Sequence, residues 1–98
     1  MPDIAKIVKG KSKIKFPKEP SVAYATVTAI VTHVETAKQA ENGFLWAAEN
    51  ASAEWAQLLA SDLFPQLRER GLYDEFAKSI VKDKSALEFI NNYARLAA

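Results

Sequence analysis

The chain has 98 residues, and its 13 Lys+Arg and 12 Asp+Glu give a formal net charge of +1. A hydrophobic fraction of 49% and a charged fraction of 26% are typical of one small globular domain and exclude a fully disordered chain. The absence of Cys excludes a disulfide scaffold, a Cys-ligated metal site and a thiol nucleophile. The same absence fits a reducing cytosol, so we expect a cytoplasmic location. Polar residues interrupt the longest apolar stretch, near 22–34, so we expect no membrane span.

The charge is unevenly distributed along the chain. Residues 1–20 contain six lysines against Asp3 and Glu19, a net charge of +4, whereas residues 21–98 hold seven basic and ten acidic side chains, a net charge of −3. We therefore divide the chain into a basic N-terminal arm, 1–20, and a helical domain, 21–98.

The arm is expected to begin with a short helix over residues 3–9. Asp3 can cap its first turn, apolar residues share one face, and Gly10 fits the position just past its end. The competing interpretation is a strand, because apolar residues also alternate along this segment.

The rest of the arm, residues 11–20, reads KSKIKFPKEP. Its two prolines remove backbone donors and disfavour helix in the residues before them. We expect an extended segment that is attached to the domain by Ile14 and Phe16.

Two longer helices are expected next. Residues 22–34 are rich in β-branched residues, which favours a strand, but their length and apolar spacing favour a helix with Ser21 as its N-cap. Thr36 begins a capping-box pattern that opens a second helix over 37–50. An Asn-Gly pair at 42–43 weakens this helix, and a turn there is the competing interpretation.

Three more helices complete the predicted domain. Ser52 opens a helix that Pro65 must kink or divide and that Gly71 ends. Residues 73–81 form a short helix, and a second capping box then opens a last helix over 86–97.

Together these elements predict an all-α protein, a compact bundle of about five short helices with an extended basic N-terminal segment. Helical spacing predicts which apolar residues of the domain face the core. They are Ala23, Val27, Ile30, Val31, Val34, Ala40, Phe44, Leu45, Ala48, Trp55, Leu58, Leu59, Leu63, Phe64, Phe76, Ile80, Val81, Leu87, Ile90 and either Tyr93 or Ala94.

The motifs that suggest catalysis have simpler structural interpretations. Residues 10–12, Gly-Lys-Ser, match only the end of the P-loop pattern and fit a helix end better. His33, the only histidine, has no recognisable nucleophile beside it. Asp74 and Glu75 are adjacent on a helix, where neighbouring side chains do not face each other. We therefore predict a protein that is not an enzyme, with no catalytic residue, cofactor or metal site.

Two features indicate binding. Trp46 and Trp55 would suit a stacking platform, but aromatic residues at helical spacing usually pack in the core, and we expect this of at least one of them. Alternating lysines in the arm would suit an anionic partner, although a solvated arm is the simpler interpretation. The candidate residues for binding an anionic partner are Lys6, Lys9, Lys11, Lys13, Lys15 and Lys18.

The run IAKIVKGKSKIKFPKEPSVAYA, residues 4–25, resembles the segment that follows the ATPase core in some MoxR-type AAA+ proteins. In those proteins a short helix ending in glycine leads to an extended basic segment and then to a helical body. The chain has no complete Walker A or Walker B motif, so no nucleotide-contacting residue carries over. The resemblance implies a C-terminal accessory domain separated from its motor.

We therefore expect a non-enzymatic helical protein-interaction or accessory module with a protein partner. Its contact surface is expected to include the arm and exposed apolar residues among Leu72, Tyr73 and Phe76. The alternative hypothesis is a nucleic-acid-binding protein that uses the lysine-rich arm, and a third is an enzyme whose pocket only the fold would reveal. We also expect that the chain could form a homo-oligomer, only because homo-oligomers are common among soluble proteins.

Overall fold

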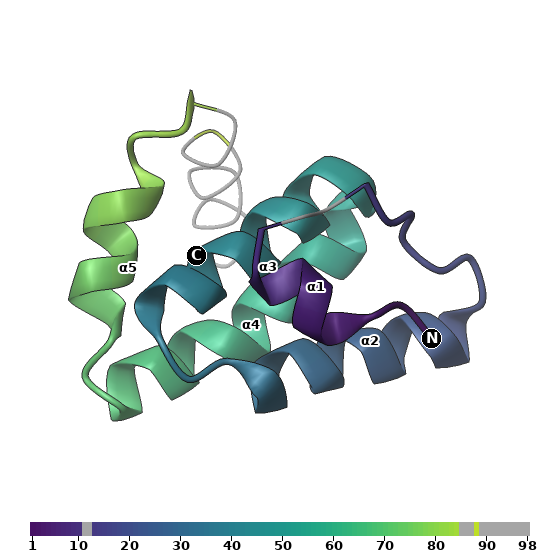
Figure 1. The fold of residues 1–98 in the computed structure, drawn as a ribbon, viewed down its shortest axis with the longest axis horizontal. Helices are drawn as coiled ribbons and strands as arrows, with labels where there is room; N and C mark the ends of the chain where they lie inside the picture. The colour runs from purple at the N-terminus through teal and green to yellow at the C-terminus, as the bar shows by residue number, and fades with distance from the viewer. Residues whose placement is uncertain (11–12, 85–87, 89–98) are drawn as a thin grey trace.

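The fold consists of helices packed around one core. A computed structural model describes residues 1–10, 13–84 and 88. Its helices are α1 (Ile4–Val8), α2 (Pro20–His33), α3 (Ala37–Asn50), α4 (Ala53–Glu69) and α5 (Tyr73–Ile80), and the described residues include no strand. Both α2 and α3 pack on α4, while α1 lies against α2 and α3, and α5 lies against α3 and α4 (Figure 1). The predicted all-α bundle is confirmed.

Both ends of α1 are satisfied by the interactions that its sequence predicts. Asp3 Oδ1 accepts a hydrogen bond from the Lys6 backbone N–H at 3.3 Å, and Gly10 takes a left-handed φ of +89° beyond the last turn. Because its apolar residues are buried on one helical face, the alternative of a strand is wrong.

The helix α2 begins earlier than its predicted N-cap. Pro20 occupies the first turn, where a missing N–H breaks no helical hydrogen bond, and Glu19 is the N-cap. The prediction of Ser21 as N-cap is therefore wrong. The buried hydroxyl of Thr26 donates to the Val22 carbonyl at 2.7 Å, so the polar residue in this apolar face is satisfied.

The helix α3 confirms the predicted capping box and runs unbroken through the Asn-Gly pair. Thr36 Oγ1 accepts from the Gln39 backbone N–H at 3.2 Å, and the Gln39 side chain accepts from the Thr36 N–H at 3.2 Å. Gly43 lies under α2, where a Cβ would come within 2.9 Å of Ile30 Cγ2. Asn42 Nδ2 donates to the Val8 carbonyl at 2.8 Å, which caps the end of α1. The Asn-Gly pair weakens α3 locally, but Gly43 lets α2 approach closely and Asn42 binds the end of α1.

The helix α4 is one element of 17 residues with Pro65 inside it, so Pro65 does not divide it. Gly71 ends it with φ +72°, and the Leu72 N–H donates to the Leu67 carbonyl at 2.8 Å, as predicted for a glycine stop. The helix α5 ends at Ile80. Val81 is 49% exposed, so its predicted place in the core is wrong, because it falls beyond the last turn. Apart from residue 88, the helix predicted over 86–97 lies outside the described residues.

The core joins the helices α1 to α5 of the described residues. Among the described residues, most apolar side chains predicted to face inward are buried. Those that are only partly buried are Val31, Leu45, Ala48, Trp55 and Leu58. The largest fully buried side chains are Trp46, Phe44 and Phe76. No helix of the described residues combines the length and apolar character that a bilayer crossing requires.

Candidate functional site

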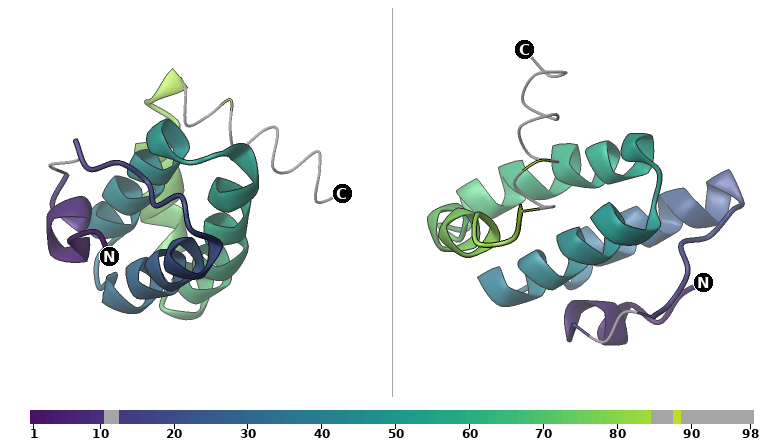
Figure 2. Two further views of the ribbon diagram at one scale, coloured as in Figure 1. Left: turned by 90° about the vertical axis from the view of Figure 1, so that its right-hand side faces the viewer. Right: turned by 90° about the horizontal axis from the view of Figure 1, so that it is seen from above.

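A short lysine-bearing segment crosses one end of the bundle between α1 and α2. We call residues 13–18 the strap; they form neither helix nor strand, and they span the end of the bundle that faces the viewer in the left panel of Figure 2. Lys13 and Lys15 are exposed, whereas Ile14 and Phe16 are partly buried. This alternation is typical of an extended chain with one face against the protein.

Two contacts attach the strap to α3 and α4. The indole Nε1 of Trp46 donates to the Ile14 carbonyl at 2.8 Å, and Trp46 itself is fully buried. The Phe16 ring lies 5.4 Å from the Trp46 ring and 6.0 Å from the Trp55 ring, centroid to centroid. A buried indole N–H needs an acceptor, and the strap supplies it. The predictions that Ile14 and Phe16 attach this segment, and that a tryptophan packs in the core, are confirmed.

The same packing decides what the two tryptophans can bind. Phe16 covers both Trp46 and Trp55, and the Trp46 N–H is already used by the strap. The aromatic surface is thus occupied by the chain's own residue. A ligand would have to displace Phe16 to stack on Trp46.

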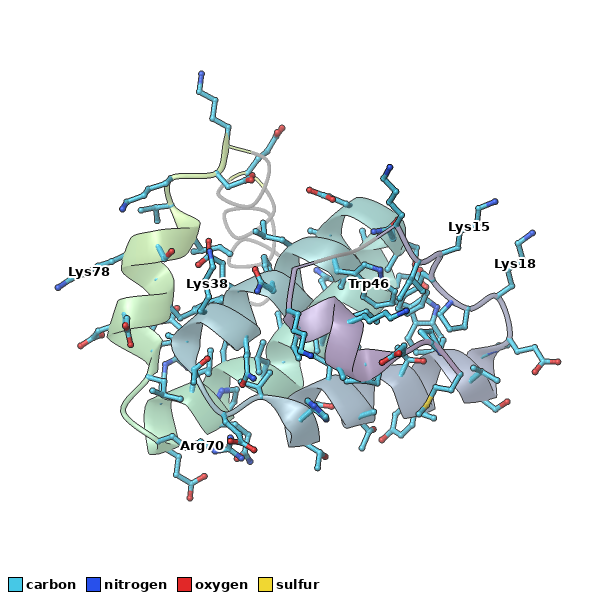
Figure 3. The ribbon with its side chains drawn as sticks, in the orientation of Figure 1. Lys15, Lys18, Lys38, Trp46, Arg70 and Lys78 are labelled. Carbon is cyan, nitrogen blue, oxygen red and sulfur yellow. The ribbon has the colours of Figure 1, made fainter. Side chains whose placement is uncertain are left out.

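The strap and α1 present their lysines to solvent. Lys15 and Lys18 extend away from the bundle on the side of the strap, opposite Lys78 on α5 (Figure 3). Within the described part of the chain, no ion pair joins the lysines of the strap or of α1 to an acidic side chain. The exposed members of the predicted anionic-partner site are Lys6, Lys9, Lys13, Lys15 and Lys18. Lys11, its remaining member, lies outside the described residues.

The other titratable residues that the sequence singles out are dispersed. His33 is exposed at the end of α2, and Asp74 and Glu75 are exposed in the first turn of α5. Among the described residues, no three His, Cys, Asp or Glu side chains are grouped so that they could hold a metal ion. An open depression of about 360 Å³ lies between α2 and α4 and is lined mainly by polar side chains.

One buried charged contact was missed from the sequence. Glu41 is only 8% exposed, and its Oε2 accepts a hydrogen bond from Ser79 Oγ at 2.5 Å, with Lys38 Nζ at 3.8 Å. This contact ties α3 to α5. A glutamate among the apolar positions of a helix was the available signal, but its partner 38 positions away required the fold.

The apolar contact surface predicted around the start of α5 is wrong in part. Phe76 is fully buried, and its ring packs edge-on against Phe44 with centroids 6.0 Å apart. Leu72 and Tyr73 are partly buried, and the Arg68 guanidinium lies 4.5 Å from the centroid of the Tyr73 ring. These residues complete the core because α5 folds back onto α3 and α4.

Comparisons of the chain with protein-family models, curated proteins and solved structures gave no match. The function is therefore inferred from the geometry of the chain itself.

Proposed function

We propose that this chain is a non-enzymatic helical protein-interaction module that binds an acidic partner protein through the lysines of the strap. One observation carries the proposal. The apolar side chains of the strap are directed into the bundle, while Lys13, Lys15 and Lys18 remain exposed and form no ion pair within the described residues.

A strap that is already attached is a better binding element than a loose arm. The hydrogen bond from Trp46 and the contacts of Phe16 hold its main chain in place before any partner arrives. Binding then orders little more than the lysine side chains, at about 0.5–1.5 kcal/mol each. Exposed lysines also attract an acidic surface over a distance, which speeds association at low ionic strength.

The alternative proposal is a nucleic-acid-binding protein that uses the same lysines. Phosphate contacts need only exposed cations, and the strap supplies three. Single-stranded nucleic acids also need aromatic platforms for their bases, and Phe16, the aromatic residue of the strap, is packed against tryptophans. This packing favours an acidic protein over a nucleic acid.

We further propose that the module belongs to a cytoplasmic AAA+ assembly as its accessory C-terminal domain. The support is the order of elements along residues 4–25, in which α1, a glycine stop and a basic strap precede α2. In such an assembly the strap would contact an acidic client or a neighbouring subunit.

The proposal is tested by neutralising the strap. A fluorescein-labelled peptide of alternating glutamate and valine, and a labelled DNA oligomer of equal charge, are titrated with the chain at low and moderate salt. One variant changes Lys13, Lys15 and Lys18 to glutamine, and the matched control makes the same change at three exposed lysines on and after α5, Lys78, Lys82 and Lys84.

We expect the strap variant to lose at least about tenfold in affinity for the peptide, because the contacts are electrostatic, and the control to lose much less. Equal losses in both variants would contradict the proposal. Tighter, strap-dependent binding of the DNA would establish the alternative.

A further inference from the structure

The main chain of the strap is almost unpaired. No backbone–backbone hydrogen bond among the described residues involves residues 13–18. Among the described residues, one hydrogen bond reaches the main chain of the strap: the Trp46 indole N–H donates to the Ile14 carbonyl. Backbone N–H and C=O groups are strong hydrogen-bonding groups, and those of the strap have almost no partner among the described residues.

Groups without a partner among the described residues lie along both edges of the strap, and the edge that matters for a partner is the one formed by Lys13 and Lys15. In an extended chain the N–H and C=O groups of neighbouring residues point to opposite edges. Because the Ile14 carbonyl points to the bundle, the N–H and C=O groups of Lys13 and Lys15 are on the edge that points away from Trp46. Pro17 has no N–H and limits the edge on its C-terminal side.

We propose that this outer edge receives an extended acidic segment of the partner protein, which pairs with the main chain of Lys13 and Lys15 as an added β-strand. An unpaired extended edge is a template for such strand addition. This inference rests on the proposed function, since it specifies how the acidic partner is bound.

The lysines of the strap favour an acidic segment over a second copy of the chain at this edge. A second copy of the chain would place lysine opposite lysine, and like charges directly opposite each other on paired strands are destabilising. Lysines on an exposed edge protect proteins from this kind of self-pairing. An acidic segment would instead place its carboxylates beside Lys13 and Lys15.

The partner segment should alternate acidic and apolar residues. On paired strands, side chains of one face of the sheet lie next to one another. Acidic residues would share the exposed face with Lys13 and Lys15, and apolar residues would share the inner face with Ile14 and Phe16. Trp55 is partly buried and its ring lies 6.0 Å from that of Phe16, so we expect an apolar residue of the partner segment to pack near it.

The decisive probe is backbone N-methylation of the alternating glutamate–valine peptide. Two peptides are made, one methylated at the amides of the glutamates and the other at those of the valines. Each peptide loses the backbone N–H donors of one of its two edges, and the two peptides keep the same charge and the same amino acids. Because one edge pairs with the strap, we expect one methylated peptide to bind at least about tenfold more weakly and the other to bind nearly as well as the parent.

Hydrogen exchange locates the pairing on the chain. In the complex with the parent peptide, exchange of the Lys13 and Lys15 amides should slow at least about tenfold, while that of the Ile14 amide on the inner edge should change little. Equal weakening by both methylated peptides, without protection of these amides, would overturn strand addition. If binding still depended on the strap lysines, the proposed function would remain.

Protection of Lys13 and Lys15 that grows with chain concentration, without peptide, would identify a second copy as the occupant and refute the acidic segment. Failure of the parent peptide to bind would also refute strand addition. The proposed function is lost if neutralising the strap lysines weakens binding to acidic proteins no more than the control variant does.

Discussion

Replacing Phe16 with alanine should release the strap while the bundle stays folded. The substitution removes a partly buried ring and its contacts with Trp46 and Trp55. Complete burial of a phenylalanine makes truncation cost about 3–5 kcal/mol, so a partly buried one should cost roughly half of that. The attachments that remain are the partly buried Ile14 side chain and the hydrogen bond to its carbonyl, which contributes about 1 kcal/mol. Without the aromatic contacts they should hold the segment much less firmly.

The assay follows the indole N–H of Trp46 by NMR. In the native chain this donor is bonded and its residue fully buried, so its hydrogen exchange should be slow. In the Phe16→Ala chain we expect faster exchange, a red shift of tryptophan emission and a free energy of unfolding lower by about 2 kcal/mol. Lys15→Ala, at an exposed position of the same strap, is the matched control and should change none of these quantities.

An unchanged exchange rate of the Trp46 indole in the Phe16→Ala chain would refute this reasoning. It would mean that the strap is held by contacts other than the aromatic ones. Complete unfolding of the variant would equally contradict the account, because the strap would then be an essential part of the core.

Three further substitutions test the packing of the helices. In a denaturant titration, Gly43→Ala should lower the free energy of unfolding by about 1–2 kcal/mol. The added methyl group gains about 1 kcal/mol in helix propensity, but its overpacking against the fully buried Ile30 should cost more. Increased stability would contradict the close approach of α2 and α3. Gly71→Ala meets no atom within 4 Å, so its loss should be only the left-handed strain of about 1–2 kcal/mol, seen as a lower Tm. Ser79→Ala removes the hydrogen bond to Glu41 and should cost about 1.5–3 kcal/mol; an unchanged Tm would show that this bond contributes nothing.

Local signals along the chain predict most helix boundaries. Asp3, the capping box at Thr36 and the stop at Gly71 act on backbone groups within a few residues, so the sequence nearby contains all the information they need. The earlier start of α2 also has a local cause. Pro20 is favoured in the first turn of a helix, so the N-cap is Glu19 and not Ser21.

Tertiary contacts explain what the sequence left open. The Asn-Gly pair at 42–43 is a local weakness in a helix, and only the packing of α1 and α2 on α3 shows its use. The attachment points of the strap were predicted because Ile14 and Phe16 are the apolar residues of a lysine-rich segment. The acceptor role of the Ile14 carbonyl was not predicted, because its donor, Trp46, is 32 positions away.

A charge-reversal cycle tests most directly whether the strap binds an acidic partner. The affinity of the alternating glutamate–valine peptide is measured for the native chain and for Lys15→Glu, and each measurement is repeated with a peptide in which one glutamate is replaced by lysine. The account predicts that each single reversal weakens binding, that the two together restore part of the loss, and that Lys78→Glu restores none. Additive losses, or equal rescue by Lys78→Glu on α5, would contradict binding at the strap.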